Sequence, residues 1–252
     1  MHTAGPTAQP ADPRRTLPKP VALITGASRG FGRALAHDLA AAGWSLVLDA
    51  RGADDLVAAG AGLVPARTRL LPGDVRHAGH REDLVAAAWD LGGLDLLVNN
   101  ASHLGPSPQP RLADYEPRDL ATVYDVDVLA PHALLREALP QLRRSGGTVV
   151  NVSSDAAVEA YEGWGGYGSA KAALDHLSAV LAVEEPDVRV YALDPGDMRT
   201  DMHQQAFPGE DISDRPEPGT VAVPALRVLL ERRPASGRYR ATDLLLPAGA
   251  AR

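Results

Sequence analysis

A tyrosine and a lysine stand four residues apart in the segment "YGSAK", at Tyr167 and Lys171. Lys171 is one of two lysines in a chain that carries 25 lysines and arginines together, so arginine serves almost everywhere else. On a helix the two side chains would lie on one face, one turn apart. The ammonium group favours the phenolate, and we therefore expect Lys171 to lower the pKa of Tyr167 from its ordinary value of about 10. The pair predicts proton transfer to a carbonyl oxygen or from an alcohol.

Ser154 stands thirteen residues before Tyr167, directly after the β-rich segment 148–153. A hydroxyl group at the end of a strand can hold a substrate carbonyl oxygen beside the tyrosine, where negative charge develops during the reaction. The three side chains together favour an enzyme that reduces a carbonyl group or oxidises an alcohol.

Three glycines follow the first apolar segment in "VALITGASRGFGRALAHDLA", at Gly26, Gly30 and Gly32. A glycine-rich turn between a strand and a helix lets a pyrophosphate approach the backbone and the positive end of the helix dipole. The segment therefore predicts a dinucleotide site. The same residues, "GASRG" (26–30), also match the nucleophile elbow of a hydrolase. That motif needs an oxyanion loop from an earlier strand, and only a proline-rich segment precedes Val21, so the hydrolase alternative is disfavoured.

The second strand ends in "LVLDAR" (46–51), which offers both an acid and a base to a ribose 2′-oxygen. Asp49 would bind a 2′-hydroxyl group, as in NADH, whereas Arg51 would bind the 2′-phosphate of NADPH. Arg29 in the glycine turn adds a second guanidinium group, and two such groups outweigh one carboxylate. We predict NADPH, with NADH as the less favoured cofactor. Asp74, in "GDV" after the third strand, either accepts from an adenine amino group or caps the next helix.

Short β-rich segments alternate with longer helical ones along most of the chain. This order predicts an α/β fold with a doubly wound parallel sheet covered by helices on both faces. No interior linker or repeat divides the chain, so we expect one domain over residues 20–252. The expected strands are 21–25, 45–50, 67–71, 94–99, 148–153 and 188–193, and helices are expected at segments such as 32–43 and 82–92.

Two segments depart from this alternation. Residues 1–19 are rich in proline and lack the apolar core of a signal peptide, so we expect a disordered N-terminal extension. Residues 201–219 are polar and proline-rich, and they are long for a connection within a domain. We expect this second segment to be a substrate loop or lid.

The composition excludes several classes of function. The 252 residues carry a net charge of −7, which argues against nucleic acid or an anionic membrane as a partner. No segment is long and apolar enough to span a membrane, and we expect a cytoplasmic protein. The absence of cysteine excludes disulfides and thiol catalysis. The two histidines of "HAGH" (77–80) lack a carboxylate at ligand spacing, so we expect a surface loop there and no metal.

In combination, "TGASRGFG" (25–32), "NNA" (99–101), Ser154, "YGSAK" and "PGDMRT" (195–200) resemble the short-chain dehydrogenase/reductase family. The resemblance runs from Val21 to about Thr200. It implies a mainly seven-stranded Rossmann sheet, a nicotinamide cofactor and catalytic roles for Ser154, Tyr167 and Lys171. The cofactor-binding residues that we predict are Gly26, Ser28, Arg29, Gly30, Phe31, Gly32, Arg51, Asp74, Val75, Asn99, Ala101, Tyr167, Lys171, Pro195, Gly196, Met198 and Thr200. Substrate contacts are expected from His103, Leu104, Trp164 and Met202.

Two positions depart from the family pattern. Ser102 replaces the usual glycine after "NNA", a change that a small hydroxyl side chain is expected to tolerate. Asp127 stands where the family has an asparagine that completes a proton relay to the lysine through water. An ionised aspartate accepts from that water but cannot donate to it, and it would raise the pKa of Lys171. We therefore expect Asp127 to alter the relay without abolishing activity.

These observations predict an NADPH-dependent ketoreductase that acts on a small-molecule carbonyl or secondary alcohol. Two alternatives stay open: an NAD-dependent alcohol or sugar dehydrogenase of the same fold, and a nucleotide-binding sensor with weakened catalysis.

The family resemblance implies a homodimer or homotetramer that packs helices containing residues 115–143 and 167–183. An apolar stripe at Ala172, Leu174, Leu177 and Leu181 is consistent with this packing, and segment 236–249 is a candidate last strand at an interface. The Ala-, Arg- and Pro-rich composition is typical of GC-rich genomes such as those of actinobacteria, an association that points to secondary metabolism.

Overall fold

The computed structural model describes residues 19–246 of the chain. Most of the extension expected at 1–19 therefore lies outside the described residues, as does the end of segment 236–249. Within the described part, one seven-stranded sheet runs in the order β3-β2-β1-β4-β5-β6-β7, with every neighbouring pair parallel. The doubly wound α/β sheet in a single domain is confirmed. Its strands are β1 (Val21–Ile24), β2 (Ser45–Ala50), β3 (Thr68–Pro72), β4 (Leu96–Asn99), β5 (Thr148–Val152), β6 (Arg189–Asp194) and β7 (Gly237–Arg240).

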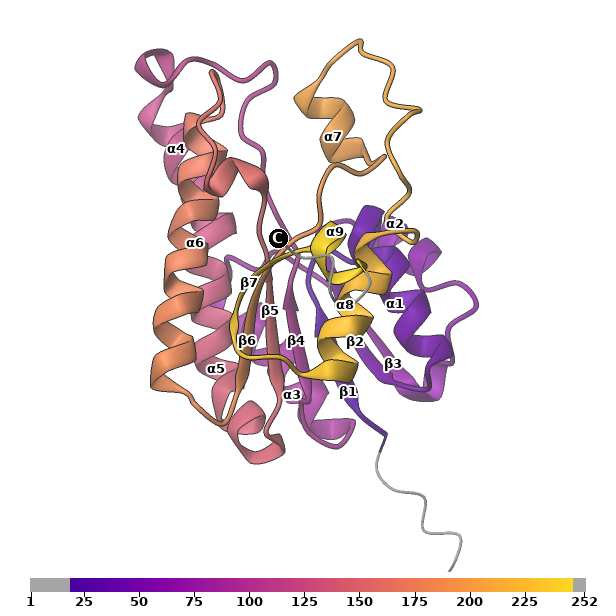
Figure 1. The fold of residues 1–252 in the computed structure, drawn as a ribbon. Helices are drawn as coiled ribbons and strands as arrows, with labels where there is room; N and C mark the ends of the chain where they lie inside the picture. The colour runs from indigo at the N-terminus through magenta and orange to yellow at the C-terminus, as the bar shows by residue number, and fades with distance from the viewer. Residues whose placement is uncertain (1–18, 247–252) are drawn as a thin grey trace, which may run out of the picture.

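Helices cover both faces of the sheet (Figure 1). Side chains alternate between the two faces along each strand, so Ala22 and Ile24 of β1 enter one core while Val21 and Leu23 enter the other. The first core packs against α1 and α8, and the second packs against α3, α5 and α6. The longer helices are α1 (Gly30–Ala41), α3 (Ala78–Asp90), α5 (Ala130–Ser145), α6 (Gly165–Glu184) and α8 (Ala222–Arg232). The shorter ones are α2 (Ala53–Ala59), α4 (Pro117–Tyr124), α7 (Asp201–Ala206) and α9 (Ala241–Leu244).

The strand order reverses at β1, which pairs with β2 on one side and with β4 on the other. Connections from β1 and β4 leave toward opposite faces at this point, and they open a crevice at the carboxyl ends of the strands. Ligands of open parallel sheets bind in such a crevice. The fold thus brings the ends of β1, β2, β4, β5 and β6 to one place.

The segment expected to be a substrate loop begins as a helix. Thr200 caps α7, with its Oγ1 accepting a hydrogen bond of 3.2 Å from the backbone N–H of His203, and irregular backbone follows up to α8. This segment stands above the carboxyl edge of the sheet in Figure 1. The last expected strand also divides in two, since Gly237–Arg240 extend the sheet as β7 while Ala241–Leu244 turn into α9. No helix within residues 19–246 is long and apolar enough to cross a membrane.

Candidate active site

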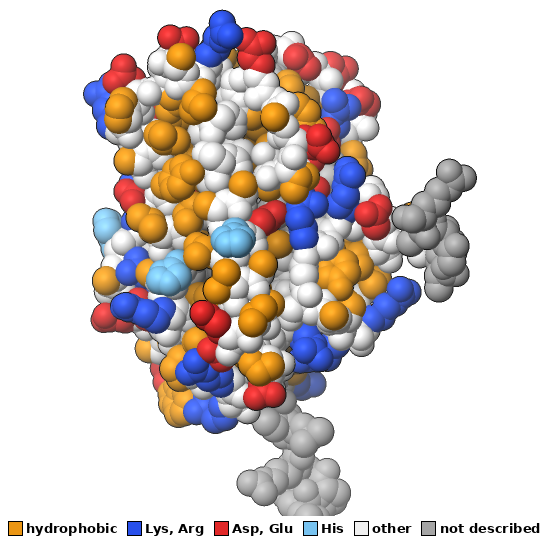
Figure 2. Space-filling view, turned by 60° about the vertical axis from the view of Figure 1, so that its left-hand side comes forward, with side chains coloured by type: hydrophobic (Ala, Val, Ile, Leu, Met, Phe, Trp, Pro, Cys, Tyr) orange, Lys and Arg blue, Asp and Glu red, His pale blue; other side chains and the backbone are white. Residues whose placement is uncertain are grey.

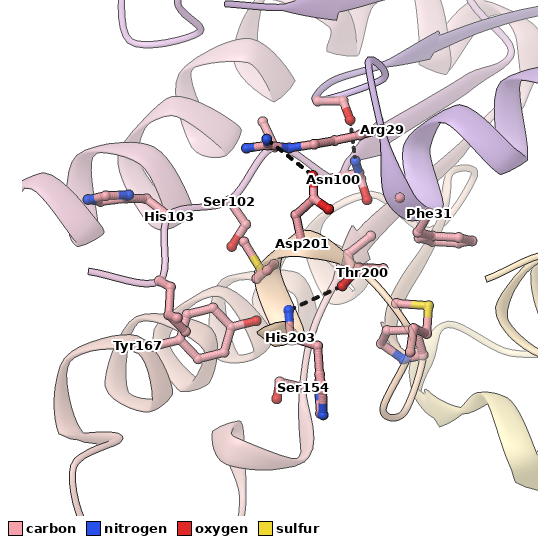
Figure 3. A pocket seen from close by; sticks show the side chains of 18 of the residues that line it. Arg29, Phe31, Asn100, Ser102, His103, Ser154, Tyr167, Thr200, Asp201 and His203 are labelled. Carbon is pink, nitrogen blue, oxygen red and sulfur yellow. Dashed lines mark hydrogen bonds and ion pairs between the residues drawn. The ribbon is translucent and has the colours of Figure 1, made fainter. Parts of the chain in front are cut away.

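A pocket lies at the carboxyl edge of the sheet, where the glycine turn, the strand ends and α7 meet. In Figure 3, Tyr167 and Ser154 lie toward one end of this pocket, and Arg29 and Phe31 lie toward the other. All four residues predicted to contact substrate line it, namely His103, Leu104, Trp164 and Met202. Most of the predicted cofactor residues line it as well: Gly26, Ser28, Arg29, Gly30, Phe31, Arg51, Asp74, Val75, Ala101, Tyr167, Lys171, Pro195, Gly196, Met198 and Thr200.

The glycine turn has no room for side chains. Gly26 has a φ of +65°, and a Cβ atom there would lie 2.8 Å from the Cα atom of Ala101. A Cβ atom on Gly32 would lie 2.6 Å from Asn100 Nδ2, so Gly32 supports the turn from behind without lining the pocket. Helix α1 begins at Gly30, and its N-cap residue Arg29 makes no side-chain cap hydrogen bond. The first amide groups of α1 are therefore free of a side-chain cap, as an anion site at a helix N-terminus requires.

Two asparagines stand at the end of β4, and we predicted only the first of them, Asn99, as a cofactor-binding residue. Asn99 does not line the pocket: its Nδ2 donates to Asn151 Oδ1 at 2.7 Å inside the sheet. Asn100 lines the pocket instead, and its Nδ2 donates to the carbonyl oxygens of Thr25 and Gly26 at 2.8 and 3.1 Å. Asn99, which we predicted as a cofactor contact, thus faces the interior of the sheet and not the pocket. Alternation along β4 directs the first asparagine inward and leaves the second to hold the glycine turn.

At the predicted adenosine end of the pocket, both acidic side chains pair with a neighbouring basic side chain. Asp49 is 2% exposed, and its Oδ1 lies 2.6 Å from Nε2 of His80. His80 is in the first turn of α3 and half-buried, so its assignment to a surface loop is wrong. Asp74 forms an ion pair of 2.6 Å with Arg76, and hydrogen bonding from this guanidinium group lowers the pKa of Asp74 to about 2. Since His77 is the N-cap of α3, the helix-cap alternative for Asp74 is excluded.

Tyr167 and Lys171 lie one turn apart near the start of α6, as their spacing predicts, and both are buried. Lys171 Nζ donates to the carbonyl oxygen of Val152 at 3.0 Å and lies 5.4 Å from the centre of the Tyr167 ring. The ammonium group is thus fixed at the end of β5, close to the face of the tyrosine ring. An arginine would bring a larger, planar group to a position with 2% exposure, which explains why a lysine stands here.

Asp127 lies behind this lysine and not in the pocket. It belongs to a π-helical turn, Asp125–Leu129, that interrupts the helical run from α4 to α5. Its carboxylate is fully buried, with Oδ1 at 3.7 Å from Lys171 Nζ and accepting a 3.1 Å hydrogen bond from the backbone N–H of His103. Its other oxygen has no hydrogen-bond partner among the described residues. Asp127 therefore acts on the pocket through Lys171 and the chain at His103.

The expected lowering of the Tyr167 pKa is overturned. Burial raises the pKa of Tyr167, the Lys171 ammonium group opposes this in part, and the Asp127 carboxylate raises it further, so that it lies above its ordinary value. Burial lowers the pKa of Lys171, but Asp127 and Tyr167 more than offset this effect, so that this pKa is raised, as we expected. The proximity of Tyr167 and Lys171 was predicted correctly, but burial and the Asp127 carboxylate outweigh the ammonium group and raise the pKa of the phenol.

Ser154 lines the pocket at the end of β5, where its hydroxyl group already has partners. Its Oγ donates to Asp155 Oδ1 at 2.9 Å and accepts from the backbone N–H of Ala156 at 3.2 Å. A hydroxyl group carries one proton, so donation to a substrate oxygen requires Ser154 to release Asp155.

Residues 20–211 match the family described as short chain dehydrogenase. The chain belongs to this family. Among its relatives, the sepiapterin reductase of Bos taurus is 36% identical over 75% of this chain and 77% of that protein. The crystal structure of a short-chain dehydrogenase from Streptomyces avermitilis is 30% identical, covers 90% of this chain and 91% of that one, and superposes with a TM-score of 0.77. An alcohol dehydrogenase from Thermococcus sibiricus, in complex with 5-hydroxy-NADP, is 29% identical and superposes with a TM-score of 0.78, covering 93% and 98% of the two chains.

In this short-chain dehydrogenase, several pocket residues lie outside the motifs that we quoted. His203 and Ala206 of α7 line the pocket, and the ring of Phe207 lies beside that of Trp164, tilted by 43° with ring centres 5.9 Å apart. Asp201 forms an ion pair of 3.4 Å with Arg29 across the pocket. We did not predict these residues because we expected segment 201–219 to be a loop rather than to begin with a helix. The Thr200 cap followed by an acid was the local signal for a helix that presents one face to the pocket.

Proposed function

We propose that this short-chain dehydrogenase is an NADPH-dependent reductase of carbonyl groups in small molecules. The observation that carries the proposal is the arrangement of the pocket: Ser154, Tyr167 and Lys171 at one end, and the uncapped glycine turn with two arginines at the other. The first end has the groups for protonating a carbonyl oxygen. The second end has the groups for binding a dinucleotide phosphate.

The residues present fit a nicotinamide dinucleotide. The cradle at Gly26 and Gly30 would hold the pyrophosphate on the backbone amides of the turn and of α1, and Lys171 would hold the nicotinamide ribose. Arg51 is exposed at the carboxyl end of β2, where it would bind a 2′-phosphate. When bound, the reduced nicotinamide supplies a hydride to the substrate carbonyl carbon.

The chain's own residues then handle the oxygen of that carbonyl. Ser154, once released from Asp155, donates a hydrogen bond to the oxygen and stabilises its developing negative charge. Tyr167 transfers its phenolic proton to the same oxygen, so that the carbonyl becomes an alcohol and the tyrosine becomes a phenolate. Lys171 stabilises this phenolate until a proton returns to it. The pKa of Tyr167 is raised by burial, so the phenol, which is the form that donates this proton, is the form present at neutral pH.

An aromatic and apolar wall supports the choice of substrate class. Leu104 and Tyr167 pack with Trp164 and Ala206, and the ring centres of Trp164 and Tyr167 lie 5.9 Å apart. Such a wall suits an apolar or aromatic ketone. The similarity to a sepiapterin reductase and the Ala-, Arg- and Pro-rich composition are consistent with a cytoplasmic enzyme of secondary metabolism.

We also propose that the enzyme is a homodimer or homotetramer that packs through α4, η3 (Asp125–Leu129) and α6. The face that these elements form comes forward in Figure 2 and carries hydrophobic side chains. The stripe predicted for α6 needs correction, because Leu174 and Leu181 are buried in the core. The exposed apolar residues on this face are Leu177, Val180 and Val183 of α6 and Leu129 of η3.

The test is to titrate the purified full-length chain with NADPH and with NADH, and then to measure ketone reduction with the better cofactor. We expect tighter binding of NADPH, and a loss of about a thousandfold or more in kcat for Tyr167→Phe with cofactor affinity retained. A preference for NADH would favour the alcohol-oxidising alternative. If neither cofactor bound, the proposed function would be wrong.

A further inference from the structure

His80 is the feature of the adenosine end that the proposed mechanism does not use. Its Nε2 contacts Asp49 Oδ1 at 2.6 Å, with side-chain exposures of 11% and 2%. Asp49 lines the pocket, whereas His80 does not. The imidazole therefore binds the carboxylate from behind, at the end of β2 where short-chain dehydrogenases of this sheet type meet the adenosine ribose.

The surroundings are shaped to hold the ring in this place. A Cβ atom on Gly73 would lie 2.3 Å from Nδ1 of His80, so only a glycine at that position admits the imidazole. The second oxygen of Asp49 faces the backbone N–H of Gly26 at 3.5 Å, in the glycine turn. Each carboxylate oxygen of Asp49 thus has a partner within the protein.

We propose that His80 is a specificity-determining residue for the 2′-phosphate of NADPH. By pairing with Asp49 it keeps that carboxylate from accepting a hydrogen bond from a ribose 2′-hydroxyl group, and in its protonated form it offsets the negative charge beside the phosphate. Arg51 and Arg29, which line the pocket, then remain as the side chains that would bind the 2′-phosphate. The inference rests on the proposed function, because it concerns the same cofactor site.

The electrostatics of the pair agree with this role. The hydrogen bond that His80 Nε2 donates to the Asp49 carboxylate raises the pKa of His80, with smaller contributions from Asp83 on the same helix and from Asp74. Burial raises the pKa of Asp49, which His80 opposes and Asp74 reinforces. A raised histidine pKa means that the imidazolium is present below that pKa and is lost as the pH rises through it. Deprotonation leaves the pair with one net negative charge, so the preference for NADPH should fall at alkaline pH.

The experiment compares three chains by fluorescence titration with NADPH and NADH: the native protein, His80→Ala, and His77→Ala as the matched control. His77 lies in the same segment, and its side chain makes no cap hydrogen bond. We expect His80→Ala to weaken NADPH binding about tenfold, with NADH unchanged or tighter, since an unpaired carboxylate next to a phosphate is repulsive. His77→Ala should leave both affinities unchanged.

A second variant, His80→Gln, retains a hydrogen-bond donor but cannot become charged. Above about pH 7, where a phosphate monoester with a pKa of about 6 stays fully ionised, the NADPH-to-NADH affinity ratio should fall in the native protein as the pH rises through the His80 pKa, and it should stay constant in His80→Gln. An unchanged ratio in His80→Ala, or a ratio in the native protein that does not respond to pH, would overturn the inference while leaving the proposed function intact. Failure of the native protein to bind either cofactor would overturn both.

Discussion

Asp127 changes the chemistry of two residues without reaching the pocket itself. It lies 3.7 Å from Lys171 Nζ, and its carboxylate raises the pKa values of both Lys171 and Tyr167. An asparagine at this position would keep an acceptor for the backbone N–H of His103 but remove the charge. Asp127 is therefore a positioning residue that adjusts the acidity of the phenol.

We predict that Asp127→Asn shifts the pH dependence of alcohol oxidation. In that direction the Tyr167 phenolate accepts the proton, so kcat/KM falls as the pH drops below the tyrosine pKa. Removing the carboxylate lowers this pKa, and the acid limb of the profile should move to lower pH. Asp125→Asn, on the exposed side of the same π-helical turn, is the control and should leave the profile unchanged. An unshifted acid limb in Asp127→Asn would show that its charge does not reach the phenol.

At the scale of elements, the strand-turn-helix unit of β1 and α1 depends on close approach between two loops. The Gly26 backbone passes the chain after β4 so closely that a Cβ atom would lie 2.8 Å from Ala101 Cα. That neighbour is backbone and cannot rotate away. The conformation of the turn therefore depends on its close contact with the chain after β4 as well as on its own glycines.

We predict that Gly26→Ala lowers the free energy of unfolding by about 2–4 kcal/mol and abolishes dinucleotide binding, because it combines a positive φ with a backbone clash. Gly62→Ala provides the control: its φ is +83°, but nothing lies within 4 Å of the added Cβ atom. It should cost about 1–2 kcal/mol through backbone strain alone, and cofactor affinity should be retained. Urea unfolding and fluorescence titration measure the two effects. Equal losses in both variants would contradict the role of the close approach.

At the scale of the whole molecule, the exposed apolar side chains of α6 have no partner within the described chain. Val183 is 82% exposed and Val180 is 41% exposed, on a helix whose opposite side is in the core. Apolar side chains gathered on one face are typical of an interface between subunits.

We predict that Val180→Glu combined with Val183→Glu converts the native oligomer to a monomer, because two carboxylates would be desolvated in the interface. Val57→Glu is the matched control, since Val57 is 63% exposed on α2, on another part of the surface. Analytical ultracentrifugation of the three proteins measures the change. A native protein that sediments as a monomer would contradict the proposed assembly.

Local spacing in the sequence determined the strands, the glycine turn and the Tyr167–Lys171 pair, because each depends on backbone geometry within a few residues. The alternation of these elements then predicted the parallel sheet with helices on both faces. Spacing did not reveal which of Asn99 and Asn100 faces the pocket, since neighbouring side chains on a strand point to opposite sides.

Only the tertiary structure decided the charges around the predicted site. His80 meets Asp49 across elements that are distant in the chain, whereas the family resemblance had already placed Asp127 near Lys171, whose Nζ lies 3.7 Å from its carboxylate. The reversal of the expected Tyr167 pKa has the same origin, because burial and a carboxylate from another helix outweigh the local ammonium group. Desolvation and long-range pairing depend on which surfaces pack together, and packing is a property of the folded chain rather than of any short segment of it.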